Sequence, residues 1–135
     1  MTCFWDGILN ALEPEDFKIF SKTYGRFTIY TKPKSKEFIN ILKINNTKTK
    51  SIKWQDKILS ENELNENFEH IKNFNENLIN NGYYCSICDP FLCLICELLN
   101  VNIIHKYLST TIKYTKNNVK KTLHFCSNKN HFWKV

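Results

Sequence analysis

The stretch DPFLCLICELLNVNII, residues 89–104, decides the fold because the spacing of its apolar residues changes in the middle. Asp89 followed by Pro90 is a typical helix start, since an Asp side chain caps free backbone N–H groups and proline fits the first helical position. The apolar run after them predicts a buried helix over residues 90–99. Beyond the helix the period becomes two, which predicts a strand over residues 101–104.

Helices are expected before this stretch and strands after it. The expected helices cover residues 3–12, 15–24, 35–44 (with Ser35 as N-cap) and 61–80, and residues 52–54 are expected to be extended. A strand is the alternative over residues 35–44, because isoleucine is plentiful there. The later strands are expected over residues 110–115, 123–126 and 132–135, with a turn at Ser127–Asn130 before the last one. This order predicts one α+β domain over residues 1–135, with N-terminal helices followed by an antiparallel-rich C-terminal sheet.

The helix expected over residues 61–80 has the clearest pattern. Ser60 and Glu63 have the spacing of a capping box, in which each side chain accepts a hydrogen bond from the other's backbone. Apolar residues recur at steps of three and four and are expected to face the core: Leu64, Phe68, Ile71, Phe74 and Leu78.

The composition excludes several classes of protein. With 42% hydrophobic and 24% charged residues, the chain is expected to be ordered. The most apolar run, residues 91–104, is interrupted by Glu97, Asn100 and Asn102, so no membrane span is expected. The N-terminus lacks a basic segment followed by a long apolar one, so no secretory signal is expected. These features predict a soluble cytoplasmic protein.

The charge is basic and unevenly distributed. The net charge is +6, from 19 Lys and Arg against 13 Asp and Glu, and Arg26 is the only arginine. Because arginine is the usual reader of guanine edges, we expect no specific nucleic acid partner. Lysines gather in residues 32–57 and glutamates in residues 61–76, which indicates either two solvated faces of opposite charge or a docking surface. The sequence leaves the oligomeric state open.

Six cysteines without an export signal indicate reduced thiols. Cys85 and Cys88, together with Cys93 and Cys96, form two C-x₂-C units, a usual source of zinc ligands. Only four residues separate the units, whereas zinc ribbons use about 15–20. We therefore expect buried thiols, in the core also for Cys126, and neither a bound metal nor a cofactor. A zinc-stabilised interaction domain is the alternative.

Cys3 and His131 form the candidate catalytic pair. Cys3 lies at the start of the first expected helix, where the dipole and the N–H groups lower the pKa of a thiol. His131 follows the last turn, and an imidazole beside a thiolate stabilises it and later protonates a leaving amine. The remaining histidines are expected to be structural or exposed: His70, His105 and His124.

These segments resemble, in their order, the papain-like cysteine peptidases, and most closely the ovarian-tumour (OTU) deubiquitinases. The segment CFWDGIL, residues 3–9, is similar to the family's cysteine followed by an aromatic residue and a helix. The segment LHFCSNKNHF, residues 123–132, is similar to its late strand, polar turn and His-aromatic pair. Residues 89–104 resemble the intervening helix and strand. A compact Lys- and Asn-rich chain of this type would suit the AT-rich genome of a large DNA virus.

The resemblance implies a deubiquitinase that cleaves ubiquitin isopeptide bonds through an acyl-enzyme. Cys3 would be the nucleophile and His131 the base and then the acid, with ubiquitin or a ubiquitin-like protein as the partner. The backbone N–H of Cys3 would contribute to the oxyanion hole, although only Met1 and Thr2 stand where the family has an Asp-Gly loop.

The third catalytic position of the family is occupied by Trp133, whose side chain cannot accept a hydrogen bond from the imidazole. Asn128 and Asn130 are the remaining candidates, and both have the primary role of turn residues. The alternative function is therefore an OTU-like binding or structural module with weak or absent catalysis.

Overall fold

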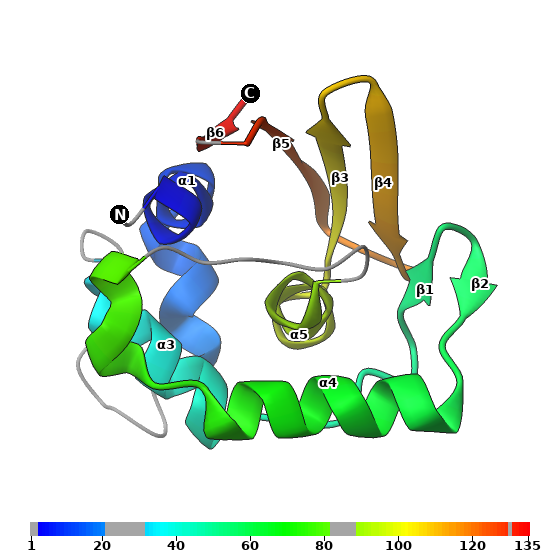
Figure 1. Ribbon diagram of the computed structural model, residues 1–135, viewed down its shortest axis with the longest axis horizontal. Coiled ribbons are helices and arrows are strands. Elements are labelled where there is room, and N and C mark those ends of the chain that lie inside the picture. The colour runs from blue at the N-terminus through cyan, green and yellow to red at the C-terminus, as the bar shows by residue number, and fades with distance from the viewer. Residues whose placement is uncertain (1–2, 21–31, 82–88, 130) are drawn as a thin grey trace.

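The computed structural model describes residues 3–20, 32–81, 89–129 and 131–135 and has an α+β fold (Figure 1). Its α-helices are α1 (Cys3–Ala11), α3 (Ser35–Ile44), α4 (Glu61–Asn73) and α5 (Pro90–Leu99), and its 3-10 helices are η1 (Pro14–Phe20) and η2 (Glu76–Asn81). Its strands are β1 (Lys53–Trp54), β2 (Lys57–Ile58), β3 (Val101–Tyr107), β4 (Thr110–Thr115), β5 (Lys121–Ser127) and β6 (Phe132–Lys134). Among the described residues, no helix combines the length and the apolar character that crossing a bilayer would need.

The described strands form one mixed sheet in the order β2-β1-β4-β3-β5-β6. β3 and β5 are parallel and all other neighbours are antiparallel, so the sheet is antiparallel-rich as predicted, except at its centre. The parallel pair arises because β4 and β5 lie on opposite sides of β3 and are joined by a short link, residues 116–120. Asn100 holds this link: its carbonyl accepts from the Lys120 N–H and its amide donates to the Asn118 carbonyl, both at 3.0 Å.

The hairpin β1–β2 extends the sheet beyond the C-terminal strands that the sequence predicts. Its two turn residues, Gln55 and Asp56, have φ angles of 52° and 64°, as a type I′ turn requires. The Gln55 side chain pairs with β4, accepting from the Lys113 N–H at 3.0 Å and donating to the Thr111 carbonyl at 3.1 Å. The sequence pattern misses this hairpin because Gln-Asp is not the usual Asn-Gly pair and the stabilising contacts come from another strand.

The buried helix α5 is the centre of the core. The Asp89 carboxylate accepts from the Phe91 and Leu92 N–H groups at 2.8 and 3.1 Å, which confirms the predicted cap, and Pro90 occupies the first turn. Figure 1 shows α5 between the sheet and the helices α3 and α4. Trp5 of α1 packs edge-on against Phe91, with ring centroids 4.8 Å apart. Helix α5 thus joins the N-terminal helices to the sheet.

Helix α4 ends at Asn73, earlier than predicted. The capping box at Ser60 and Glu63 is confirmed, with hydrogen bonds of 3.1 and 2.9 Å. At the other end, Phe74 leaves the helical conformation, and Lys43 of α3 donates to its carbonyl at 2.6 Å. This lysine satisfies a helix-end carbonyl that a longer helix would have bonded internally.

The apolar stripe of α4 is narrower than predicted. Leu64 and Ile71 are buried in the core, whereas Phe68 is half-buried and lies outside it, so the prediction for Phe68 is wrong. Phe74 is half-buried and packs against the core, and the side chain of Leu78 falls outside the described residues. After the early end of α4, the next buried core residue that the structure describes is Ile79 of η2.

The two other N-terminal segments also differ slightly from prediction. Lys34, not Ser35, is the N-cap residue of α3, and the Ser35 hydroxyl instead donates to the Asp6 carboxylate at 3.4 Å. The helix predicted over residues 15–24 is the 3-10 helix η1, and residues 21–24 lie outside the described part.

A buried carboxylate fastens η1 to the sheet. Asp16 is buried, and its two oxygens accept from Lys120 and Lys121 at 2.5 and 2.7 Å. Burial alone would raise the pKa of Asp16, but hydrogen bonds from both lysines and from the Glu13 N–H outweigh burial and hold the pKa below its ordinary value. The ion pairs join residues more than a hundred positions apart in the chain.

Candidate functional site

Helix α1 lies beside β6, the strand that follows His131 (Figure 1). Cys3 is the first residue of α1, and its neighbour Phe4 packs against Phe132 of β6 with ring centroids 4.9 Å apart. The structure therefore brings together the two chain segments that carry the predicted pair, although the side chain of Cys3 falls outside the described residues.

Gly7 allows α1 to approach β6 closely. A Cβ atom at Gly7 would lie 2.8 Å from Cδ1 and 3.1 Å from Cε1 of Phe132, well inside ordinary van der Waals distance. One helical turn separates Gly7 from Cys3, so this contact sets the distance between the first turn of α1 and the strand after His131. The glycine of the CFWDG segment thus has a packing role that its spacing alone does not reveal.

The turn before β6 was predicted over Ser127–Asn130, whereas Ser127 is the last residue of β5 and the described hydrogen bonds join Asn128 to His131. The Asn128 N–H donates to the His131 carbonyl and the His131 N–H donates to Asn128 Oδ1, both at 2.9 Å. The His131 side chain is exposed. Asn128 therefore uses its side-chain oxygen on the backbone of the turn, and Asn130, the second candidate for a third catalytic member, lies outside the described residues.

Aromatic side chains pack against β6 on the face of the sheet that is turned toward the helices. The Phe132 ring stacks on Phe125 with centroids 4.9 Å apart and lies 5.2 Å from the His105 ring. His105 is buried, and its Nε2 is 2.6 Å from the Ser127 hydroxyl. Burial lowers the pKa of His105. His105 was expected to be structural or exposed, and it is buried on the same face of β3 as Val101, in a contact with Ser127 that the sequence does not reveal.

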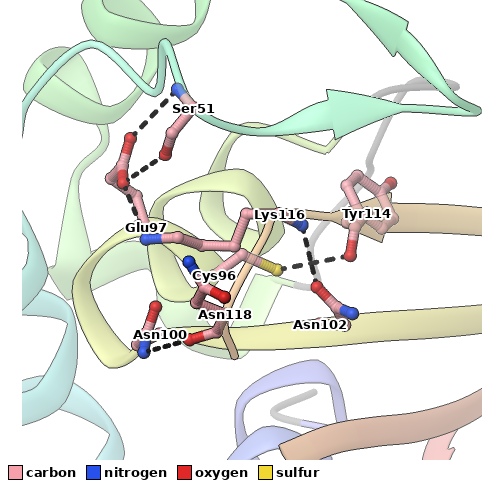
Figure 2. Close-up of polar contacts among 8 residues, drawn as sticks. All are labelled: Ser51, Cys96, Glu97, Asn100, Asn102, Tyr114, Lys116 and Asn118. Carbon is pink, nitrogen blue, oxygen red and sulfur yellow. Dashed lines mark hydrogen bonds and ion pairs between the residues drawn. The ribbon is translucent and has the colours of Figure 1, made fainter. Parts of the chain in front are cut away.

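The cysteines of α5 are core residues, as predicted. Cys93 and Cys96 are fully buried, and the Cys96 thiol lies 3.9 Å from the Tyr114 carbonyl (Figure 2). Burial strongly raises the pKa of Cys96, which makes it a poor nucleophile. Cys85 and Cys88 lie outside the described residues, and within the described ones no group of three His, Cys, Asp or Glu side chains is placed to hold a metal ion.

Cys126 differs from its prediction. It is half-buried rather than in the core, because the alternation of β5 turns Leu123 and Phe125 toward the helices and Cys126 away from them. Cys126 is paired across the strands with Trp133 of β6.

Figure 2 shows a polar network at the far end of α5. The Glu97 carboxylate accepts from the Ser51 hydroxyl at 2.6 Å and from Lys116 Nζ at 3.2 Å. Burial would raise the pKa of Glu97, but these hydrogen bonds lower it overall. The network joins α5 to the segment before β1 and to the end of β4, which is a structural role.

The two charged segments found in the sequence partly neutralise each other. Lys43 lies 3.0 Å from Glu76, and Lys48 lies 3.2 Å from Glu61. The acidic residues Glu66 and Glu69 in the middle of α4 are exposed. Two ion pairs account for part of the charge, and the docking alternative stays open for the exposed residues of both segments.

No family model, no curated protein and no solved structure matches this chain. The function is accordingly inferred from the residues of the α1–β6 site itself.

Proposed function

We propose that the protein is a cysteine peptidase of the OTU type that hydrolyses ubiquitin isopeptide bonds. The observation that carries the proposal is the packing of α1 on β6, which places the helix that begins at Cys3 against the strand that follows His131. Phe4 and Phe132, which are separated by almost the whole chain, are in contact there, and this contact supports the proposal.

The chemistry follows from the two side chains. The Cys3 thiolate would attack the isopeptide carbonyl, and the tetrahedral intermediate would be stabilised in part by the backbone N–H of Cys3. Collapse of the intermediate would break the C–N bond while His131 gives a proton to the leaving lysine amine. His131 would then remove a proton from water, whose attack on the thioester releases the ubiquitin carboxylate and restores Cys3.

A binding module without catalysis is the second candidate, and one observation favours it. The side-chain oxygen of Asn128 accepts from the His131 backbone N–H and so helps to form the turn. Trp133, at the family's third position, cannot accept a hydrogen bond. Catalysis without a third member orienting the imidazole would be slow.

Ubiquitin with a C-terminal propargylamide discriminates between the two functions, because it forms a stable thioether only with an activated cysteine. We expect one adduct per chain, mapped to Cys3 by mass spectrometry, and its loss in Cys3→Ala and His131→Ala. Cys126→Ala is the matched control and should react fully.

Selective alkylation provides a second measurement that requires no ubiquitin. Iodoacetamide at pH 6 should modify Cys3 faster than Cys126, since a nearby imidazole and the helix terminus favour the thiolate. If the probe binds without forming an adduct and Cys3 alkylates no faster than Cys126, the peptidase assignment is wrong and the binding module replaces it.

A further inference from the structure

The sheet has one face that the described helices leave uncovered, which we call the outer face. On the opposite face, the side chains of Val101, Ile103 and Phe125 are buried against the helices. Figure 1 shows α1, α4 and α5 on that side of the strands. By strand alternation and register the outer face consists of Lys53, Asn102, Ile104, Lys106, Thr111, Lys113, Thr115, Thr122, His124, Cys126 and Trp133.

The outer face is basic because the C-terminal part of the chain contains no acidic residue. Residues 98–135 include seven lysines and neither Asp nor Glu. Three of these lysines neutralise carboxylates elsewhere, Lys116 with Glu97 and the pair at residues 120–121 with Asp16.

The lysines of the outer face have no such partner. Lys53, Lys106 and Lys113 are exposed, and no carboxylate in the described part of the chain forms an ion pair with any of them.

The register places these cations beside an exposed aromatic ring. Lys106, Cys126 and Trp133 lie in one row across β3, β5 and β6, and the Trp133 side chain is 44% exposed. The neighbouring row contains Lys113 and His124. With strands about 4.8 Å apart and rows about 7 Å apart, the backbone positions of Lys106 and Lys113 lie about 10–16 Å from that of Trp133, and that of Lys53 lies about 24 Å from it.

We propose that the outer face binds single-stranded nucleic acid without sequence preference. The lysines would contact phosphates as point charges, and a base would stack on the Trp133 indole, the combination that single-strand binding surfaces use. An acidic polypeptide would interact with the lysines alone, and its carboxylates would not stack on the Trp133 indole. The outer face contains no arginine, which fits binding without base reading.

Fluorescence anisotropy with fluorescein-labelled oligo(dT)₂₀ tests the proposal on the full chain. With three lysine–phosphate contacts, the affinity should fall about 20-fold between 50 and 200 mM NaCl, since single strands give a slope of about 0.7 per contact. The double variant Lys106→Glu/Lys113→Glu should lose at least about tenfold in affinity and most of this salt dependence. Trp133→Ala should lose about tenfold with the salt dependence unchanged, whereas Trp133→Phe should retain most of the affinity.

The matched control is Lys18→Glu/Lys72→Glu, which changes the net charge equally at two exposed positions in η1 and α4. This control should bind nearly as the parent does, and thermal melts of all variants establish that they are folded. Equal binding by the two double reversals, or no binding by the parent at 50 mM NaCl, overturns the proposal.

Two competitors separate the other possible partners. If poly-glutamate displaces oligo(dT)₂₀ at equal charge concentration, the outer face binds acidic proteins, and the nucleic acid proposal is wrong. If the parent self-associates but does not bind oligo(dT)₂₀, and the Lys106→Glu/Lys113→Glu variant does not self-associate, the outer face binds the acidic α4 of a second copy. That outcome also contradicts the nucleic acid proposal. Cys3→Ala should bind like the parent, which keeps this test independent of the peptidase proposal.

Discussion

Replacing Gly7 by alanine should loosen the contact between α1 and β6. The new Cβ atom would lie 2.8 Å from Phe132 Cδ1, so about 0.7 Å or more of movement is needed to reach an ordinary carbon–carbon distance. The Phe132 ring cannot move freely, because Phe4, Phe125 and His105 pack around it at centroid distances of 4.9–5.2 Å. Overpacking of this kind costs about 1–3 kcal/mol.

Helix propensity opposes this cost. Alanine is better than glycine in a helix by about 1 kcal/mol, so the net loss in free energy of unfolding should be about 1 kcal/mol, or a melting temperature lower by about 3–5 °C. Asn10→Ala, at an exposed position of the same helix, is the control and should stabilise the protein slightly.

Urea denaturation of Gly7→Ala, Phe132→Leu and the double variant measures the coupling directly. Shortening Phe132 removes the clashing atoms, so the double variant should be at least about 1 kcal/mol more stable than the sum of the single effects predicts. Gly7→Ala should also slow reaction of Cys3 with the ubiquitin propargylamide, because the helix start moves away from His131. A Gly7→Ala variant that is more stable than the parent, with no coupling to Phe132, would refute the close approach of α1 and β6.

Three further predictions concern the remaining buried groups. Because burial lowers the pKa of His105, its ring stays neutral in the folded protein while the unfolded chain takes up a proton, so the free energy of unfolding should fall as the pH drops from about 7 to 5. His105→Gln should flatten this dependence of the urea midpoint on pH, leaving the part due to His70, whose pKa burial also lowers. Asp16→Asn should cost about 1–3 kcal/mol by thermal melting, because two charged hydrogen bonds are weakened, and an unchanged melting temperature would show that the pairs contribute nothing. Phe68→Ala should cost only about 1–2 kcal/mol in urea, against about 3–5 for a fully buried aromatic residue.

Local sequence signals predicted the elements that local contacts stabilise. The caps at Asp89 and Ser60 involve residues two or three positions apart, and both helices begin where the sequence indicates. The features that were missed depend on distant residues: the hairpin at Gln55 is completed by β4, and the end of α4 is set by Lys43 of α3. No periodicity within one segment contains that information.

In the candidate site, too, the local features were predicted and the contacts between distant segments were not. The polar residues before His131 predicted a turn there, and Asn128 forms two hydrogen bonds with the His131 backbone. The packing of His105 on Phe132 joins β3 to β6 beneath this turn. In the sequence, the only signal for it is that His105 occupies an apolar position in the alternation of β3. The half-buried position of Cys126 follows from the alternation of β5, in which Leu123 and Phe125 face the helices.

The alternation of β6 separates the two proposed functions by a single residue. Phe132 points inward, where it fixes β6 against α1 and so the position of His131, whereas Trp133 is paired with Cys126 on the outer face. Substitutions at these neighbours should therefore have opposite profiles. Phe132→Leu should impair the reaction of Cys3 and leave oligo(dT)₂₀ binding intact, and Trp133→Ala should weaken oligo(dT)₂₀ binding. A Phe132→Leu variant that loses both activities equally, while remaining folded, would show that the two faces of the sheet do not act separately.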